Sequence, residues 1–205
     1  MPPALLLLAA LSTLPELILL AADYGMIGSG HWRRQSYQNY AFWSGLMGDW
    51  RPNYPVQPYA MFVTYAFLHS GPFHMITNMA ILLGLGPVIW RQQGGTGFGL
   101  IYLAAILGGA LAFGLLSDSP RPMVGASGAL FGLLGAWMTH NLSERRRGAL
   151  PLWPVGMMIL GLITLNAITW CLQSGALAWE THLGGFIAGW VVVWVLRDYL
   201  PNNSS

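Results

Sequence analysis

Two short motifs carry side chains that together could catalyse acyl transfer. Ser127 lies within Gly125-Ala126-Ser127-Gly128, and His182 opens the run His182-Leu183-Gly184-Gly185. A serine hydroxyl becomes a nucleophile when a base within hydrogen-bond reach takes its proton, and histidine is the most frequent base. Ser127 and His182 are therefore the candidate nucleophile and general base. The chain contains no lysine, which excludes a Ser–Lys pair.

A second polar group could stabilise a developing oxyanion. His74 and Asn78 are four residues apart, so they share one face of a helix, and His69 precedes them. Acyl transfer needs hydrogen-bond donors directed at the oxyanion. The Asn78 amide, the His74 imidazole and the backbone N–H of Ser127 could supply them.

Each of these residues also has a reading without catalysis. A Gly-x-Ser-Gly motif by itself is typical of close helix packing, and an isolated His182 would be a hydrogen-bonded bundle residue. His69, His74 and His182 could instead form a zinc site. The sequence has no His-Glu-x-x-His motif, and the lone Cys171 excludes a cysteine-rich site, so we predict neither metal nor cofactor.

The composition is that of a membrane protein. Hydrophobic residues make up 55% of the chain and charged residues only 8%, whereas about 25% are charged in a soluble domain. The net charge of +2 is too small to indicate nucleic-acid binding. The expected partners are the lipid bilayer and other membrane-spanning segments.

Hydropathy predicts one all-α membrane domain over residues 1–205, because backbone polar groups in lipid must be satisfied within helices. The first apolar run lacks the positive charge that precedes a signal-peptide core, so we interpret it as a span. Six spans are predicted, at residues 4–22, 59–90, 98–116, 124–141, 152–171 and 177–196.

Residues 23–58 are too polar to span but are rich in aromatic side chains, which favour the headgroup region. Four of these residues fall on one helical face, which predicts a short amphipathic helix in the interface. They are Tyr40, Trp43, Met47 and Trp50. An ordinary loop with interfacial anchors is an equal alternative.

Arginines near the span ends predict the orientation. Arg145-Arg146-Arg147 follows the fourth span, Arg91 the second and Arg197 the sixth. Positive residues are enriched on the cytoplasmic side, so both termini are expected there, although Arg33, Arg34 and Arg51 lie on the other side. The expected location is the inner membrane of a bacterial cell.

The fourth and sixth spans would then both begin at the outer face, with Ser127 and His182 at similar depth. Gly128 and Gly132 share a face of one helix, and Gly185 and Gly189 share a face with His182. Glycine lets membrane helices approach closely. Packing these faces together would bring the serine hydroxyl to the imidazole.

In order and spacing, these motifs resemble the rhomboid intramembrane serine proteases over residues 59–196. The matching residues are His69, His74 and Asn78, then Gly125 to Gly128, then His182, Gly185 and Gly189. The resemblance implies a six-helix bundle in which Ser127 and His182 form a dyad without an acidic member. It also implies that His74 and Asn78 stabilise the oxyanion, that His69 is structural, and that Gly185 and Gly189 contact the fourth helix. Gly125 and Gly128 would support the nucleophile.

The sequence departs from the family pattern at two points. The family often has Trp-Arg shortly before the first histidine, where this chain has Ala60-Met61. Trp32-Arg33 and Trp50-Arg51 lie too far upstream to be aligned with that pair. Phe131 replaces a frequent tyrosine; it can stack on the His182 ring but cannot donate a hydrogen bond.

The resemblance implies an active site that opens to the outer side through a water-filled cavity and cuts transmembrane protein substrates entering from the lipid. Three alternatives remain: a catalytically inactive rhomboid-like protein that binds membrane clients, a rhomboid devoted to carboxy-terminal sorting tails, and a transporter. The sequence shows no inverted repeat of the kind typical of transporters.

Overall fold

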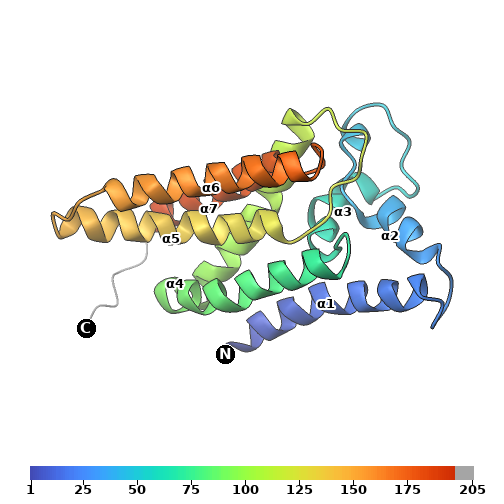
Figure 1. The fold of residues 1–205 in the computed structure, drawn as a ribbon, viewed down its shortest axis with the longest axis horizontal. Helices are drawn as coiled ribbons and strands as arrows, with labels where there is room; N and C mark the ends of the chain where they lie inside the picture. The colour runs from blue at the N-terminus through green and yellow to red at the C-terminus, as the bar shows by residue number, and fades with distance from the viewer. Residues whose placement is uncertain (197–205) are drawn as a thin grey trace.

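The fold is a bundle of helices, seen in a computed structural model that describes residues 1–196 (Figure 1). Arg197, used above for orientation, lies outside the described residues. Within them the only β-pairing is an isolated antiparallel bridge between Phe42 and Met123. The α-helices are α1 (Pro3–Asp23), α2 (Trp32–Tyr40), α3 (Gln57–Thr64), α4 (Pro72–Leu116), α5 (Ser127–Arg147), α6 (Trp153–Leu172) and α7 (Trp179–Leu196), with 3₁₀ turns η1 (Ser44–Met47) and η2 (Tyr65–Phe67).

Four helices of the described chain, α1, α4, α6 and α7, are long and apolar enough to cross a membrane. Helix α4 has 45 residues and is interrupted at Gly94, whose φ of 69° and ψ of 177° are not helical. Glycine tolerates this conformation because it has no Cβ. The chain turns sharply there, so α4 has two arms, and the second crosses the bundle obliquely (Figure 1). The predicted spans 59–90 and 98–116 are therefore joined by a stretch of α4 with a single non-helical residue, Gly94, rather than by a loop.

The second predicted span begins later than expected. Residues from 59 onward form α3 and η2, and the chain leaves helical geometry before α4 starts at Pro72. Gly71 has a φ of 124°, and Pro72 at the first helical position has no N–H that needs a partner. His69 thus lies in a break ahead of α4, while His74 and Asn78 lie in its first turns.

The predicted amphipathic helix over Tyr40 to Trp50 is wrong. Helix α2 lies upstream and ends at Tyr40, after which Ala41 is extended with a ψ of 162°. Phe42 then exchanges two backbone hydrogen bonds with Met123, at 3.0 and 2.9 Å. This pairing fixes the backbone in an extended conformation, and only the short η1 turn follows.

Helix α5 lies at the centre of the bundle, with α4 and α7 packed against it. Contacts between backbones make this possible. A Cβ atom at Gly185 would collide with the carbonyl oxygen of Gly128, and one at Gly189 would collide with that of Gly132. The predicted glycine faces of α5 and α7 therefore meet. Helix α6 lies at the periphery, and Val155 is its only buried residue in the described chain.

Candidate active site

The structure brings Ser127 and His182 together. The Ser127 Oγ atom lies 2.9 Å from His182 Nε2, a hydrogen-bond distance. Ser127 is the first residue of α5, three residues later than the predicted span begins, and His182 lies in the first turn of α7. Because the glycine faces hold the two helices at backbone contact, the hydroxyl and the imidazole meet without long side chains.

The segment before Ser127 is fixed from two sides. Met123 pairs with Phe42, and two residues later the Gly125 N–H donates to the Tyr65 carbonyl at 3.0 Å. The Tyr65 hydroxyl in turn donates to the Ile106 carbonyl at 2.8 Å. Ser127 therefore follows a loop that is held by the first loop, by η2 and by α4.

Two further side chains hold the His182 ring. Phe131, one turn after Ser127, stacks on the imidazole with ring centroids 4.1 Å apart and planes inclined by 5°. On the other side, Asn166 Oδ1 lies 2.5 Å from His182 Nδ1. The stacking was anticipated for Phe131, but Asn166 was not predicted. The available signal was a carboxamide in a largely apolar span.

His74 and Asn78 lie against the loop that precedes Ser127. A Cβ atom at Gly125 would lie 2.9 Å from His74 Nε2 and 3.8 Å from Asn78 Nδ2, so glycine is required here for space as well as for its φ of 127°. The Ser70 backbone N–H donates to His74 Nδ1 at 3.3 Å, which leaves the proton of a neutral His74 on Nε2. Asn78 Nδ2 is buried and has no hydrogen-bond partner among the described residues. Two N–H donors thus border the space beside Gly125.

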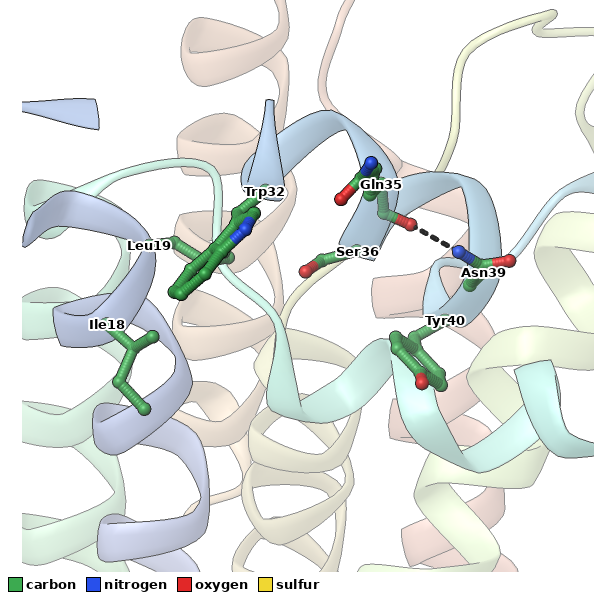
Figure 2. Close-up of a pocket in the computed structure, with 7 residues that line it drawn as sticks. All are labelled: Ile18, Leu19, Trp32, Gln35, Ser36, Asn39 and Tyr40. Carbon is green, nitrogen blue, oxygen red and sulfur yellow. Dashed lines mark hydrogen bonds between the residues drawn. The ribbon is translucent and has the colours of Figure 1, made fainter. Parts of the chain in front are cut away.

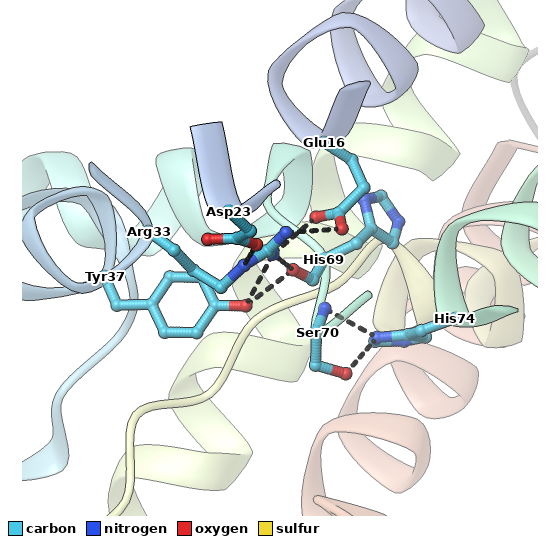
Figure 3. A network of polar contacts seen from close by, with 7 residues as sticks. All are labelled: Glu16, Asp23, Arg33, Tyr37, His69, Ser70 and His74. Atoms are coloured by element: carbon cyan, nitrogen blue, oxygen red, sulfur yellow. Dashed lines mark hydrogen bonds and ion pairs between the residues drawn. The ribbon is translucent and has the colours of Figure 1, made fainter. Parts of the chain in front are cut away.

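His69 is fully buried, and its ring packs against the His74 ring with the two centroids 5.2 Å apart. Its carbonyl oxygen accepts hydrogen bonds from the Tyr37 hydroxyl at 2.6 Å and from Arg33 Nη1 at 3.2 Å. Arg33 also pairs with the buried Glu16 of α1 at 2.9 Å (Figure 3). The first loop is therefore anchored to α1 and to the break before α4.

The first loop is anchored by Arg33, although the chain has Ala60-Met61 where the family often has Trp-Arg. Burial alone would lower the pKa of the Arg33 guanidinium, but its hydrogen bonds to carboxylate and phenol partners outweigh burial and raise that pKa. The group therefore stays charged. Trp32-Arg33, although distant in sequence, is the dipeptide whose arginine ties the first loop to the residues around His69.

A cavity of about 670 Å³ opens between α5, α6 and α7 beside the His182 ring. Most of its walls are apolar side chains, and its polar groups include the Asn166 carboxamide and the His182 imidazole. Residues that line it include Phe131, Asn166, Trp170, Trp179, His182 and Phe186. A smaller hollow of about 290 Å³ between α1 and α2, lined by Ile18, Trp32 and Tyr40 among others, includes none of the candidate catalytic residues (Figure 2).

The three histidines considered for a zinc site do not form one in the part of the chain that the structure describes. No group of three or more His, Cys, Asp or Glu residues there could hold a metal ion. His182 and His74 instead direct ring nitrogens at Ser127 and Ser70.

Apolar helices arranged in this way define a multi-pass integral membrane protein. The chain belongs to the rhomboid family, whose model, described as Rhomboid domain, matches residues 56–199.

Named relatives come from plants, mammals and a bacterium. The chain is 34% identical to RHOMBOID-like protein 5 of Arabidopsis thaliana, over 65% of this chain and 43% of that protein. It is 36% identical to Rhomboid protease GluP of Bacillus subtilis, over 62% of this chain and 24% of GluP. With Rhomboid-related protein 3 of Homo sapiens the identity is 28%, over 67% and 37% of the two chains. The chain therefore spans less than half the length of these relatives, and the family is not confined to bacterial membranes.

Proposed function

We propose that this protein is an intramembrane serine endopeptidase that hydrolyses peptide bonds in or near transmembrane segments of membrane proteins. The observation that carries the proposal is the 2.9 Å contact between Ser127 Oγ and His182 Nε2. A nucleophile needs this geometry with its base. The similarity to Rhomboid protease GluP supports the same activity.

In the proposed reaction, Ser127 Oγ attacks the scissile carbonyl carbon while His182 Nε2 takes the hydroxyl proton. The carbonyl oxygen becomes an oxyanion, and the donors beside Gly125, His74 Nε2–H and Asn78 Nδ2–H, stabilise it. His182 then gives its proton to the leaving amine. Water deprotonated by the same nitrogen hydrolyses the acyl-enzyme and restores the Ser127 hydroxyl.

The unpartnered amide of Asn78 is the main support for the oxyanion role. A buried donor without a partner costs about 1 to 3 kcal/mol, so such a group is often functional. In the transition state this N–H would gain the acceptor that it lacks in the resting protein. The interaction is therefore stronger in the transition state than before it, as catalysis requires.

We further propose six crossings, made by α1, the two arms of α4, α5, α6 and α7. Helix α5 would cross within the bundle, since nine of its residues are buried. Its carboxy-terminal turn carries Arg145, Arg146 and Arg147. The positive-inside rule assigns that end to the cytoplasm and the Ser127 end to the opposite side.

Cleavage of a membrane substrate tests the proposal. Purified protein would be reconstituted into liposomes with a single-span substrate carrying small residues near its outer end. We expect cleavage by the wild type and none by Ser127→Ala of equal thermal stability. A folded wild type that binds but does not cut a panel of such substrates would favour the client-binding alternative.

A further inference from the structure

The contact between His182 and Asn166 extends the candidate dyad to a third residue. Asn166 Oδ1 lies 2.5 Å from His182 Nδ1, on the side of the ring opposite to Ser127. In serine proteases of other folds an aspartate at this position holds the histidine in the correct tautomer. Here the partner is an uncharged amide from α6.

A second hydrogen bond fixes which end of the amide faces the ring. Asn166 Nδ2 donates to the Leu162 carbonyl, one turn earlier in α6, at 2.9 Å. A carbonyl can only accept, so the nitrogen must face Leu162 and the oxygen must face His182. The oxygen also can only accept, and the ring nitrogen Nδ1 must therefore carry the proton.

The position of that proton decides whether His182 can serve as a base. A neutral imidazole has one protonated nitrogen and one free nitrogen. With the proton on Nδ1, the free electron pair is on Nε2, which faces the Ser127 hydroxyl at 2.9 Å. In the other tautomer Nε2 would be a donor and could not take the serine proton.

An amide suits this location better than a carboxylate. Asn166 lies in an apolar span beside a largely apolar cavity, where an ionised side chain would be costly. The amide accepts the same hydrogen bond without carrying charge. It therefore orients the ring without requiring a counter-ion in the membrane.

We propose that Asn166 is a positioning residue that holds neutral His182 in the tautomer with the proton on Nδ1. This inference rests on the proposed function, because it assigns His182 the role of base. It adds a residue from the peripheral helix α6 to a site otherwise built on α4, α5 and α7. Displacement of α6 would remove the acceptor, and neutral His182 would no longer be held in one tautomer.

The tautomer can be measured directly, without activity, by NMR of protein labelled with ring-¹⁵N histidine at a pH where the imidazole is neutral. Comparison with His182→Ala identifies the signals of His182. We expect a protonated Nδ1 and a free Nε2 in the wild type. In Asn166→Leu, which keeps the size but removes the acceptor, we expect a mixture of both tautomers.

Two variants separate positioning from a structural effect. Asn166→Gln keeps an uncharged carboxamide beside the cavity and should restore the wild-type tautomer. Thr169→Val, on the same helix, removes a hydroxyl whose one hydrogen bond in the described chain is to the Leu165 carbonyl of the same helix, and it should change neither tautomer nor labelling. The rate of labelling by a fluorophosphonate should fall about five- to tenfold in Asn166→Leu, which corresponds to one neutral hydrogen bond, and recover in Asn166→Gln.

The result that overturns the inference is a wild-type tautomer of His182 in folded Asn166→Leu. That result would leave the protease proposal intact if the wild type still reacts with the fluorophosphonate. Conversely, a shifted tautomer in Asn166→Leu combined with an unreactive wild type would uphold the positioning by Asn166 and refute the protease function.

Discussion

The Ser70 backbone N–H donates a hydrogen bond to His74 Nδ1. The proton of a neutral His74 is therefore on Nε2, which lies beside Gly125. Asn78 differs, since its Nδ2 is buried without a hydrogen-bond partner in the described chain, and under the proposed mechanism the oxyanion would be its first acceptor. The two donors are thus unequal at rest. Asn78 is the clearer residue on which to test transition-state stabilisation.

Asn78→Ala should lower kcat about a hundredfold while KM changes little, because the lost hydrogen bond exists only in the transition state. The measurement is steady-state cleavage of a transmembrane peptide. Ser127→Ala and His182→Ala should each reduce turnover far more.

Thr77→Val is the matched control for Asn78→Ala. Thr77 is the preceding residue on α4, and its hydroxyl bonds to the Phe73 and His74 carbonyls of its own helix. Its kcat should equal that of the wild type. A rise in KM with unchanged kcat in Asn78→Ala would contradict the oxyanion role.

The spacing and types of residues in the sequence predicted most members of the candidate site. Ser127 and His182 could be paired because glycines four residues apart predict close helix contact, and the structure places the two side chains 2.9 Å apart. Asn166 could not be predicted, because nothing in the sequence around an amide indicates its partner on another helix.

Arg33 connects the first loop to the helix bundle through its ion pair with Glu16 on α1 and its hydrogen bond to the His69 carbonyl. Its partner Glu16 is fully buried, whereas Arg33 is 21% exposed. Arg33→Met should therefore destabilise the protein by about 3 kcal/mol, because a buried carboxylate loses its counter-ion. Thermal unfolding in detergent measures the change.

The double variant Arg33→Met, Glu16→Leu should recover part of that stability, since it removes the buried carboxylate together with the guanidinium and leaves only the partly exposed Asp23 without its arginine. The control is Glu144→Gln, which breaks an exposed pair with Arg147 and should change stability by less than about 1 kcal/mol. Equal losses in Arg33→Met and Glu144→Gln would contradict the anchoring role.

The glycine contact between α5 and α7 supports a second prediction. A Cβ atom at Gly189 would overlap the Gly132 carbonyl, so Gly189→Ala must push the helices apart. We expect a loss of about 1 to 3 kcal/mol in thermal unfolding, together with lower activity.

Gly161→Ala on α6 is the matched control for Gly189→Ala. A Cβ atom there would meet nothing within 4 Å, so neither stability nor activity should fall. Unchanged stability in Gly189→Ala would contradict the close helix contact.

Hydropathy predicted the helical segments but not how they are interrupted. Helix α4 starts at Pro72, directly after Gly71, and turns at Gly94. Hydropathy averaged over a window of many residues does not reveal the effect of such single residues. The extended segment at Phe42 depends on pairing with Met123, which is distant in sequence. Local pattern contains no information about such a partner, so the predicted amphipathic helix was wrong.

At the scale of the whole molecule, the proposed topology assigns the two ends of α5 to opposite sides of the membrane. The helix has 21 residues and so spans about 30 Å, the thickness of a hydrocarbon core. Asp118 lies in the loop before α5, and Gly148 follows its last turn.

Cysteine accessibility tests this topology in intact cells. The exposed Cys171 is first replaced by serine, and single cysteines are then introduced as Asp118→Cys or Gly148→Cys. A membrane-impermeant maleimide should label the first variant before lysis and the second only after lysis. The reverse pattern would invert the proposed orientation without affecting the site chemistry.

Reaction with a serine-directed fluorophosphonate tests whether His182 activates Ser127. Wild type, Ser127→Ala and His182→Ala would be compared in detergent after thermal unfolding has shown that all three are folded. We predict stable labelling of the wild type, none of Ser127→Ala and almost none of His182→Ala. Equal labelling of the wild type and His182→Ala, or a folded wild type that does not react, would show that His182 does not activate Ser127.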